Sequence, residues 1–328
     1  MFEKINLCVL AALVCVSAVH TQSPATTGNS TPGVIGPAPE LFSPGVISSP
    51  ANDGSPTFAP DGNSLYFTRS TAAWGVILES HKVNGQWSEP EVAPFSGQWS
   101  DSSPGMAPDG SYLIFVSLRP KTMPAAGEKV TSLRANLYRT NHTASGWSEP
   151  ERLPDAVNIG DSIWKPSIGS DGTIYFVVID AKGGKRLHSA QWKEGAYQPA
   201  QPLSFSDGTT ADVDPEIAPD GSFLLFCSSG RTKDDAKDHL FVVLKNGAAW
   251  GPVTPMRYAG DGASTDDEPH LGPGRKTIYF SSDRAVPVRF PRTHEQAVQD
   301  LKRLELWDNS NSNVWFMPIT AWLSGDPG

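Results

Sequence analysis

One pattern occurs five times along the chain and constrains the fold more than any other feature. Each copy begins with a proline in a short apolar segment, continues with Asp-Gly or a substitute for it, and ends in an apolar run closed by phenylalanine. The copies span residues 55–67, 103–115, 165–176, 214–226 and 268–280. Their leading prolines are 48, 62, 49 and 54 residues apart, which is the size of one four-stranded propeller blade.

The order of residues within a copy predicts four antiparallel strands. The segment after the leading proline is a short extended strand, and Asp-Gly makes a tight hairpin because both residues tolerate positive φ. The apolar run that follows is a buried second strand. A third strand comes next, and pairs such as Asn84-Gly85 and Asn246-Gly247 turn it back into a fourth. The chain is therefore expected to be all-β.

The two ends of the chain predict a closed ring of five blades. The last copy reaches its third strand at residues 313–319 and has no fourth. The opening segment 39–42 matches the fourth strands elsewhere, so we expect an N-terminal strand to complete the last blade and leave no open edge. Six blades are the alternative, and they would need residues 285–313. That stretch instead shows a capping box at 293–296 and an apolar helical face, which predicts one short inserted helix.

The repeated unit, Pro-x-apolar-x-Pro-Asp-Gly-x-x-Leu-Tyr-Phe, resembles the WD-repeat-like unit of the TolB-like β-propeller family. The resemblance covers about residues 37–323, in four good copies and a fifth in which Gly274-Arg275 replaces Asp-Gly. It implies a propeller. The family includes binding scaffolds, sensors and domains attached to hydrolases, and TolB itself is a periplasmic protein with six blades and a separate N-terminal domain.

The N-terminus predicts export. Residues 5–19 form an apolar run behind Lys4 that is too short to span a bilayer, so we interpret residues 1–18 as a signal peptide. Residues 19–36 are rich in Ser, Thr, Pro and Gly and are expected to be a flexible linker, followed by the propeller at 37–328. The mature chain would be periplasmic or secreted, with no transmembrane segment. It would keep only Cys227, which excludes an internal disulfide and a thiolate metal site.

The charge distribution singles out one end of the propeller. The net charge is −9, which argues against binding nucleic acid or an anionic membrane surface. Ten acidic side chains and one basic one, Lys165, fall in the predicted crossovers between blades, at residues 48–55, 96–103, 157–165, 204–214 and 259–268. Because crossovers share one face of a propeller, the sequence predicts an acidic mouth at one end of the axis.

Eight residues of this mouth are the candidate ligand-binding residues. They are Asp53, Asp101, Asp161, Asp212, Glu268, Trp99, Trp164 and His270. Three interpretations of the carboxylates stay open. They can pair with the basic loops after the second strands and lock the blades, attract a cationic partner, or hold a hard cation such as Ca²⁺ assembled around the axis. The two tryptophans could form a wall for a sugar or a peptide.

Motifs of the common enzyme classes are missing from the sequence. There is no Gly-x-Ser-x-Gly elbow, and the string that begins at His294-Glu295 lacks the second histidine of a zinc protease. We therefore expect a monomeric binding module without a cofactor that engages a protein, peptide or glycan at the acidic mouth. The alternative is a carbohydrate-active hydrolase or lyase that uses the carboxylates Asp53, Asp101, Asp212 and Glu268 at the axis.

Overall fold

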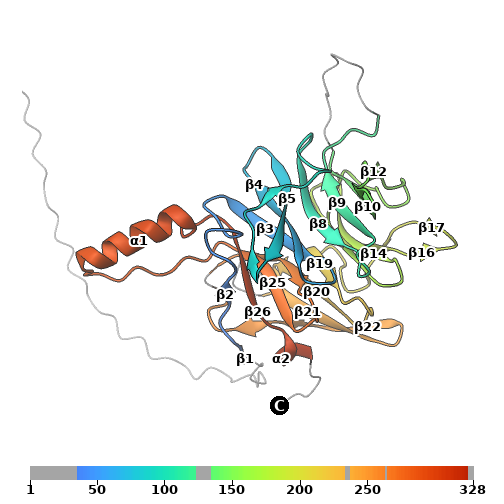
Figure 1. The fold of residues 1–328 in the computed structure, drawn as a ribbon. Helices are drawn as coiled ribbons and strands as arrows, with labels where there is room; N and C mark the ends of the chain where they lie inside the picture. The colour runs from blue at the N-terminus through green and yellow to red at the C-terminus, as the bar shows by residue number, and fades with distance from the viewer. Residues whose placement is uncertain (1–34, 123–133, 233–236, 263, 324–328) are drawn as a thin grey trace, which may run out of the picture. The chain divides into compact units, whose positions relative to one another are not determined.

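The computed structural model describes residues 35–122, 134–232, 237–262 and 264–323, and these form a five-bladed β-propeller (Figure 1). Each blade is an antiparallel sheet whose three inner strands follow one another in chain order outward from the axis. The innermost strands contact their neighbours in a ring, and the last of them contacts the first. Both the all-β class and the five blades are as predicted from the repeat. The innermost strands are β3 (Asn52–Phe58), β8 (Asp101–Met106), β13 (Ser162–Ile168), β19 (Ala211–Ile217) and β24 (Asp266–Leu271).

The remaining strands complete the blades outward from the axis. The second strands are β4 (Ser64–Ser70), β9 (Tyr112–Ser117), β14 (Ile174–Ile179), β20 (Phe223–Ser229) and β25 (Thr277–Ser282). The third strands are β5 (Gly75–Val83), β10 (Asn136–Thr143), β15 (Lys185–Ala190), β21 (His239–Asn246) and β26 (Asn313–Pro318). The outermost strands are β6 (Gln86–Trp87), β7 (Glu91–Val92), β11 (Gly146–Trp147), β12 (Glu151–Arg152), β18 (Gln201–Pro202) and β22 (Ala249–Pro255). Strands β16 (Trp192–Lys193) and β17 (Ala196–Tyr197) form a separate hairpin that follows β15 of the third blade.

The N-terminal strand β2 (Glu40–Leu41) closes the ring, as the sequence predicted. It pairs antiparallel with β26, with Glu40 opposite Phe316 and Leu41 opposite Trp315. The next residue, Phe42, packs edge-to-face on Tyr279 of the fifth blade with ring centroids 5.0 Å apart. It also packs on Trp87 of the first blade at 6.1 Å. The closing strand therefore joins the last blade to the first through aromatic contacts.

All five innermost strands carry the same irregularity, and it shapes the axis. Pairing with the second strand shifts register around the residue that precedes the leading proline. That residue has a left-handed backbone in every blade, with φ of 48° at Ser55, 50° at Ser103, 48° at Lys165, 54° at Asp214 and 50° at Glu268. Such a bulge takes one residue out of the ladder and re-aims its side chain. Five equivalent side chains are thereby removed from the sheets.

Fourth-strand aromatic residues pack between blades. Trp147 of the second blade donates a hydrogen bond from Nε1 to the Tyr66 hydroxyl of the first, at 3.2 Å. Trp250 of the fourth blade packs edge-to-face on Tyr175 of the third, with centroids 6.4 Å apart. These tryptophans hold neighbouring sheets together.

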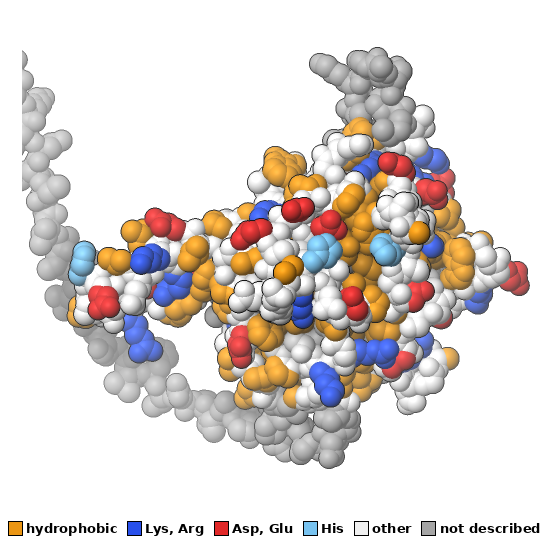
Figure 2. All heavy atoms as spheres, viewed as in Figure 1, with side chains coloured by type: hydrophobic (Ala, Val, Ile, Leu, Met, Phe, Trp, Pro, Cys, Tyr) orange, Lys and Arg blue, Asp and Glu red, His pale blue; other side chains and the backbone are white. Residues whose placement is uncertain are grey.

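The inserted helix is α1 (His294–Leu306), and it lies away from the sheets (Figure 1). Thr293 and Gln296 form the expected capping box, each side chain bonding the other's backbone. No residue of α1 is buried, and Val298, Leu301 and Leu304 are 39–53% exposed. Figure 2 shows hydrophobic side chains along this arm beside charged ones. The apolar face of α1 is thus left uncovered by the propeller.

The terminal segments contribute one further pairing and one short helix. Strand β1 (Ile35–Gly36) runs parallel to β23 (Arg257–Tyr258), and α2 (Thr320–Leu323) buries Trp322. The expected signal peptide, and the expected linker up to residue 34, lie outside the described residues. Within the described part of the chain, no helix has the length and apolar character needed to cross a bilayer.

Candidate functional site at the propeller axis

Three of the predicted mouth carboxylates are internal ion pairs. The side chains of Asp53, Asp101 and Asp212 are fully buried. Each accepts a hydrogen bond from an arginine at the end of the second strand of its own blade or directly after it. These arginines are Arg69 at 2.7 Å, Arg119 at 2.9 Å and Arg231 at 2.6 Å. The structure thus pairs the inner carboxylates with the basic loops, which was one of the three interpretations of the sequence.

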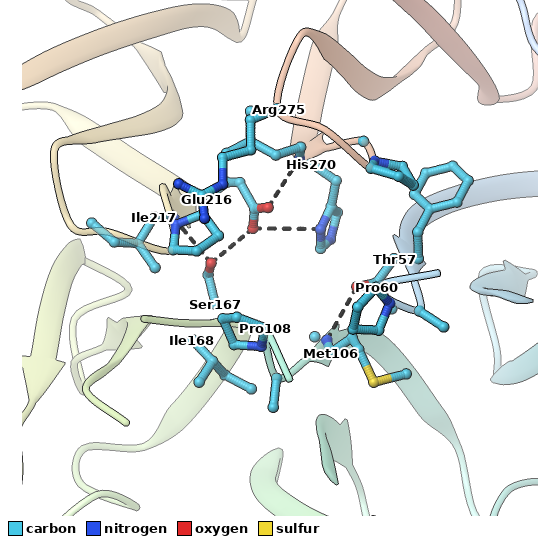
Figure 3. Close-up of a pocket in the computed structure, with 18 of the residues that line it drawn as sticks. Thr57, Pro60, Met106, Pro108, Ser167, Ile168, Glu216, Ile217, His270 and Arg275 are labelled. Atoms are coloured by element: carbon cyan, nitrogen blue, oxygen red, sulfur yellow. Dashed lines mark hydrogen bonds and ion pairs between the residues drawn. The ribbon is translucent and has the colours of Figure 1, made fainter. Parts of the chain in front are cut away.

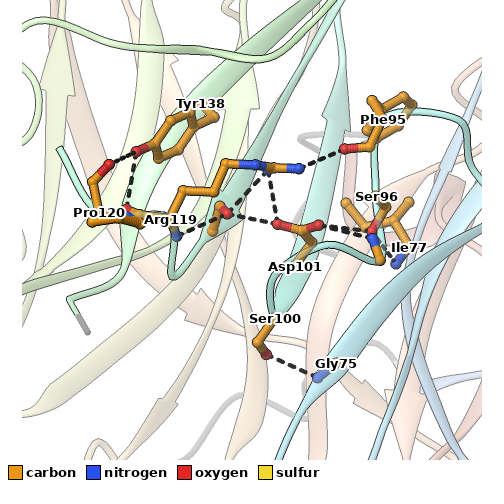
Figure 4. Close-up of polar contacts among 11 residues, drawn as sticks. Gly75, Ile77, Phe95, Ser96, Ser100, Asp101, Arg119, Pro120 and Tyr138 are labelled. Carbon is orange, nitrogen blue, oxygen red and sulfur yellow. Dashed lines mark hydrogen bonds and ion pairs between the residues drawn. The ribbon is translucent and has the colours of Figure 1, made fainter. Parts of the chain in front are cut away.

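The second blade shows how such a carboxylate is held (Figure 4). Asp101 accepts hydrogen bonds from the Ser96 and Ser117 hydroxyls, at 2.9 and 2.6 Å, in addition to the one from Arg119. Burial raises the pKa of Asp101, while these donors and the Arg119 charge lower it. Arg119 in turn donates to the Phe95 carbonyl at 2.7 Å. We call each such aspartate–arginine contact a latch, because it ties the start of an inner strand to the end of the second strand or to the loop after it.

The latch recurs in the fifth blade and is missing from the third. Asp266, fully buried, accepts from Arg284 at 2.8 Å. In the third blade the position two residues before the left-handed residue is Ile163, which is buried among apolar side chains.

Two other candidate ligand-binding residues, Asp161 and Trp99, lie elsewhere. Asp161 makes a half-exposed ion pair with Arg134 at 3.3 Å, and Trp99 is half-buried and lines neither of the two axial pockets described below.

Glu268 lies at the centre of the propeller with the other left-handed residues. It accepts hydrogen bonds from the Ser55 hydroxyl of the first blade and from the Ser281 hydroxyl of its own blade. A Cβ atom at Gly54 would lie 2.3 Å from a Glu268 carboxylate oxygen and 2.4 Å from Ser281 Oγ, so a larger residue there would have to displace both side chains. Asp214 of the fourth blade accepts from the Glu268 backbone N–H at 3.3 Å. Charges from different blades therefore meet at the axis.

Lys165 supplies the only charge of opposite sign among these five residues. It is fully buried, and its ammonium group has no hydrogen-bond partner within the described structure. Its charge lowers the pKa of Glu268, together with the Ser281 and Ser55 hydrogen bonds and against the effect of burial. Burial and the neighbouring Glu268 charge instead raise the pKa of Asp214 to about 6. Lys165 thus compensates the carboxylates only in part.

The first of two pockets opens at the crossover end of the inner strands, and we call it the crossover-face pocket. Its volume is about 390 Å³. Four carboxylates line it, those of Asp214, Asp238, Asp267 and Glu268. Burial raises the pKa of Asp267, and the Glu268, Asp214 and Asp238 charges raise it further. Asp267 has no hydrogen-bond or ion-pair partner within the described residues. Four carboxylates therefore gather at this end of the axis.

An aromatic ring and one lysine lie beside these carboxylates. Trp164 is 38% exposed and lines the same pocket. The Lys185 ammonium lies over its ring, 5.1 Å from the centroid. A cation over an indole face is a favourable arrangement. The crossover-face pocket thus already holds one ammonium group against its tryptophan wall.

The second pocket opens at the opposite end of the inner strands, between the Pro-Asp-Gly hairpins (Figure 3), and we call it the hairpin-face pocket. Its volume is about 240 Å³. Glu216 lies in its wall and accepts from the Ser167 hydroxyl at 2.7 Å and from the Leu271 N–H at 2.9 Å. His270 Nδ1 lies 3.4 Å from the same carboxylate. The structure thus separates two predicted neighbours, since Glu268 lines one pocket and His270 the other.

Several residues of these pockets escaped prediction as site residues. Asp214 and Asp267 were visible in the acidic crossovers, and the position before each leading proline was the signal for Asp214. Lys185 begins a third strand and Asp238 directly precedes one, and the repeat offers no signal at either position. Within residues 35–122, 134–232, 237–262 and 264–323, no group of His, Cys, Asp and Glu side chains has the arrangement of a metal site.

Comparison with known proteins gives solved structures only. No family model and no curated protein matches the chain. Similar solved structures include TolB from Acinetobacter baumannii, with 13% identity, a TM-score of 0.48, and coverage of 82% of this chain and 55% of that one. A putative TolB from Agrobacterium tumefaciens shows 16% identity, a TM-score of 0.49, and coverage of 83% and 91%. The α-L-arabinofuranosidase PaAbf62A from Podospora anserina shows 12% identity, a TM-score of 0.46, and coverage of 87% of this chain and 94% of that one.

Two of these structures bear the TolB name that the repeat led us to expect. At such identities and TM-scores, no activity, partner or substrate follows for this chain.

Proposed function

We propose that this chain is an exported binding module whose crossover-face pocket takes a cationic group, such as a lysine or arginine side chain of a peptide or protein. The observation that carries the proposal is the gathering of Asp214, Asp238, Asp267 and Glu268 around one open cavity. The latch aspartates have arginine partners, whereas Asp267 has none within the described residues. An entering cation would lower the electrostatic free energy of these carboxylates.

The wall of the pocket favours an organic cation. Trp164 offers a partly exposed indole face, and Lys185 lies over it. An incoming ammonium or guanidinium group could replace Lys185 on the ring while Asp238 accepts its hydrogen bonds. The calcium ion considered from the sequence stays a prediction. No group of His, Cys, Asp and Glu side chains within the described residues is arranged to hold a metal ion, so the proposal does not include one.

Binding of short charged peptides tests the proposal. A tetralysine peptide should bind, binding should weaken as salt is added, and a tetraglutamate peptide should not bind. Replacing Asp238 and Asp267 together by asparagine should weaken tetralysine binding by about tenfold or more, since a hydrogen bond between charged groups is worth 1.5–3 kcal/mol. Asp161→Asn is the matched control, because that carboxylate already pairs with Arg134 outside the pocket. Tetralysine affinity unchanged in the double variant would refute the proposal.

A hydrolase or lyase is the second candidate, and one pair of residues favours it. Asp214, with a pKa of about 6, and Glu268, whose pKa is lowered, lie together in the crossover-face pocket. Two carboxyl groups with pKa values moved apart suit a proton donor and an ionised partner. Turnover of aryl glycosides that disappears in Asp214→Asn would support this candidate over simple binding.

The expected export rests on residues 1–18, and cell fractionation tests it.

A further inference from the structure

The hairpin-face pocket is a cavity separate from the one used above, and its chemistry differs. It lies at the other end of the inner strands and shares no lining residue with the crossover-face pocket. Figure 3 shows Glu216, Ser167 and His270 directed into the space between the blades. The rings of Pro60, Pro108, Pro219 and Pro273 and the side chains of Met106 and Ile217 also line it. A polar cluster thus faces a cavity with apolar walls.

Glu216 is an ionised acceptor at this cavity. Its side chain is 11% exposed, so a small ligand can reach it. The hydrogen bonds from Ser167 and Leu271 and the proximity of His270 lower the pKa of Glu216, against the effect of burial. An ionised carboxylate is acceptor-only, with about four lone-pair sites. Three protein donors approach it, so a ligand that donates hydrogen bonds fits the remaining capacity.

His270 supports this acceptor while it stays neutral. The ring is 2% exposed, and burial and the Lys165 charge lower the pKa of His270. Because Glu216 can only accept, the proton of neutral His270 belongs on Nδ1, which faces it. Nε2 is buried and has no hydrogen-bond partner within the described structure. His270 is therefore a positioning residue for Glu216.

The charge around the cavity opposes a strongly cationic ligand. Arg275 lies at the rim, where it pairs with Asp220 at 3.0 Å, and Lys165 is close enough to His270 to lower the pKa of the imidazole. Glu216 is the one carboxylate in the lining. A neutral group with several hydroxyl donors satisfies this balance better than an ammonium group. The volume of about 240 Å³ lies below the roughly 300–1,000 Å³ of pockets for drug-sized ligands, so the ligand would be small.

We propose that the hairpin-face pocket binds a neutral, hydroxylated ligand of the size of one sugar ring. Hydroxyl groups of the ligand donate to Glu216, and the apolar faces of the ring pack on the prolines. This site is independent of the cation site at the crossover face, and each can fail without the other.

Saturation-transfer NMR with D-glucose, D-galactose and L-arabinose tests the proposal on the full mature chain. At least one sugar should bind saturably, and its addition should shift the ¹⁵N resonances of His270. Glu216→Gln should weaken binding by about tenfold or more, since it removes the charge from the acceptor. Met106→Trp should also abolish binding, because it fills the cavity without changing Glu216. Asp238→Asn, in the other pocket, is the control and should bind the sugar as the wild type does.

Several outcomes would overturn the proposal. They are the absence of saturable binding by all three sugars, binding that survives Met106→Trp, and binding that Asp238→Asn abolishes. If Glu216→Gln does not fold, Met106→Trp and the His270 resonances still decide the question. D-Glucosamine separates the two sites. It should bind the hairpin-face pocket no better than glucose, and any amine-dependent binding should weaken in Asp238→Asn.

Discussion

Arg119 donates a hydrogen bond from Nη1 to Asp101 Oδ1 at 2.9 Å, and both side chains are almost fully buried. Removing one partner of a buried ion pair leaves the other charge without compensation. Arg119→Met should therefore lower the free energy of unfolding by about 3–5 kcal/mol. Urea unfolding followed by tryptophan fluorescence measures this change.

A surface ion pair in the same blade provides the control. Lys121 and Asp155 are 2.7 Å apart, but their side chains are 66% and 64% exposed. Solvent screens such a pair, so Lys121→Met should cost less than about 1 kcal/mol. Equal costs for the two variants would contradict a structural role for the latches.

The closing strand gives a second prediction. Phe42 contacts Trp87 of the first blade and Tyr279 and Phe316 of the fifth. Phe42→Ala removes these contacts and should lower the free energy of unfolding by about 3 kcal/mol, the low end for a buried phenylalanine, because the ring is only half-buried. Phe290→Ala should stay within about 0.5 kcal/mol of the wild type, since Phe290 is 76% exposed. A Phe42 variant as stable as the Phe290 variant would show that ring closure does not depend on this side chain.

The fold could be predicted because its determinants are local and repeated. Asp-Gly hairpins, apolar second strands and the match of residues 39–42 to other fourth strands each indicate one step of the ring. The inserted helix could also be predicted from Thr293 and Gln296. Its exposure could not, since an apolar face such as that of α1 ordinarily indicates packing on a core.

The site could be predicted only in outline. The crossovers indicated an acidic end, but the identity of the free carboxylates depends on which of them meet an arginine. Asp101 and Asp267 look alike in the sequence, and only the first lies opposite a buried guanidinium. The bulge before each proline decides which side chains face the axis. The directions of Lys165 and Glu268 therefore depend on backbone geometry, which the sequence pattern alone does not indicate. The separation of Glu268 from His270 has the same origin.

The buried imidazole predicts a sensitivity to acid. The pKa of His270 is lowered from its ordinary 6.5, so below that pH the unfolded chain binds this proton more readily than the folded one. The wild type should therefore lose stability as the pH falls from 7 to about 5, and His270→Gln should lose less over this interval. His294→Gln, on the exposed helix α1, should follow the wild type. Parallel curves for the wild type and the His270 variant would contradict the prediction.

The raised pKa of Asp267 predicts the opposite dependence on pH. A carboxyl group whose pKa is higher in the folded state than its ordinary 3.8 destabilises the fold while it is ionised. Asp267→Asn should therefore be more stable than the wild type at about pH 8, and its advantage should shrink as the pH falls, until it is lost well below 3.8, where the wild-type group is protonated in both states. Thermal unfolding over this range measures the difference. Asp161→Asn should show no such gain, because its carboxylate pairs with Arg134 at the surface. An Asp267 variant less stable than the wild type at high pH would mean that a partner compensates this carboxylate, and the case for a cation in the crossover-face pocket would lose its main support.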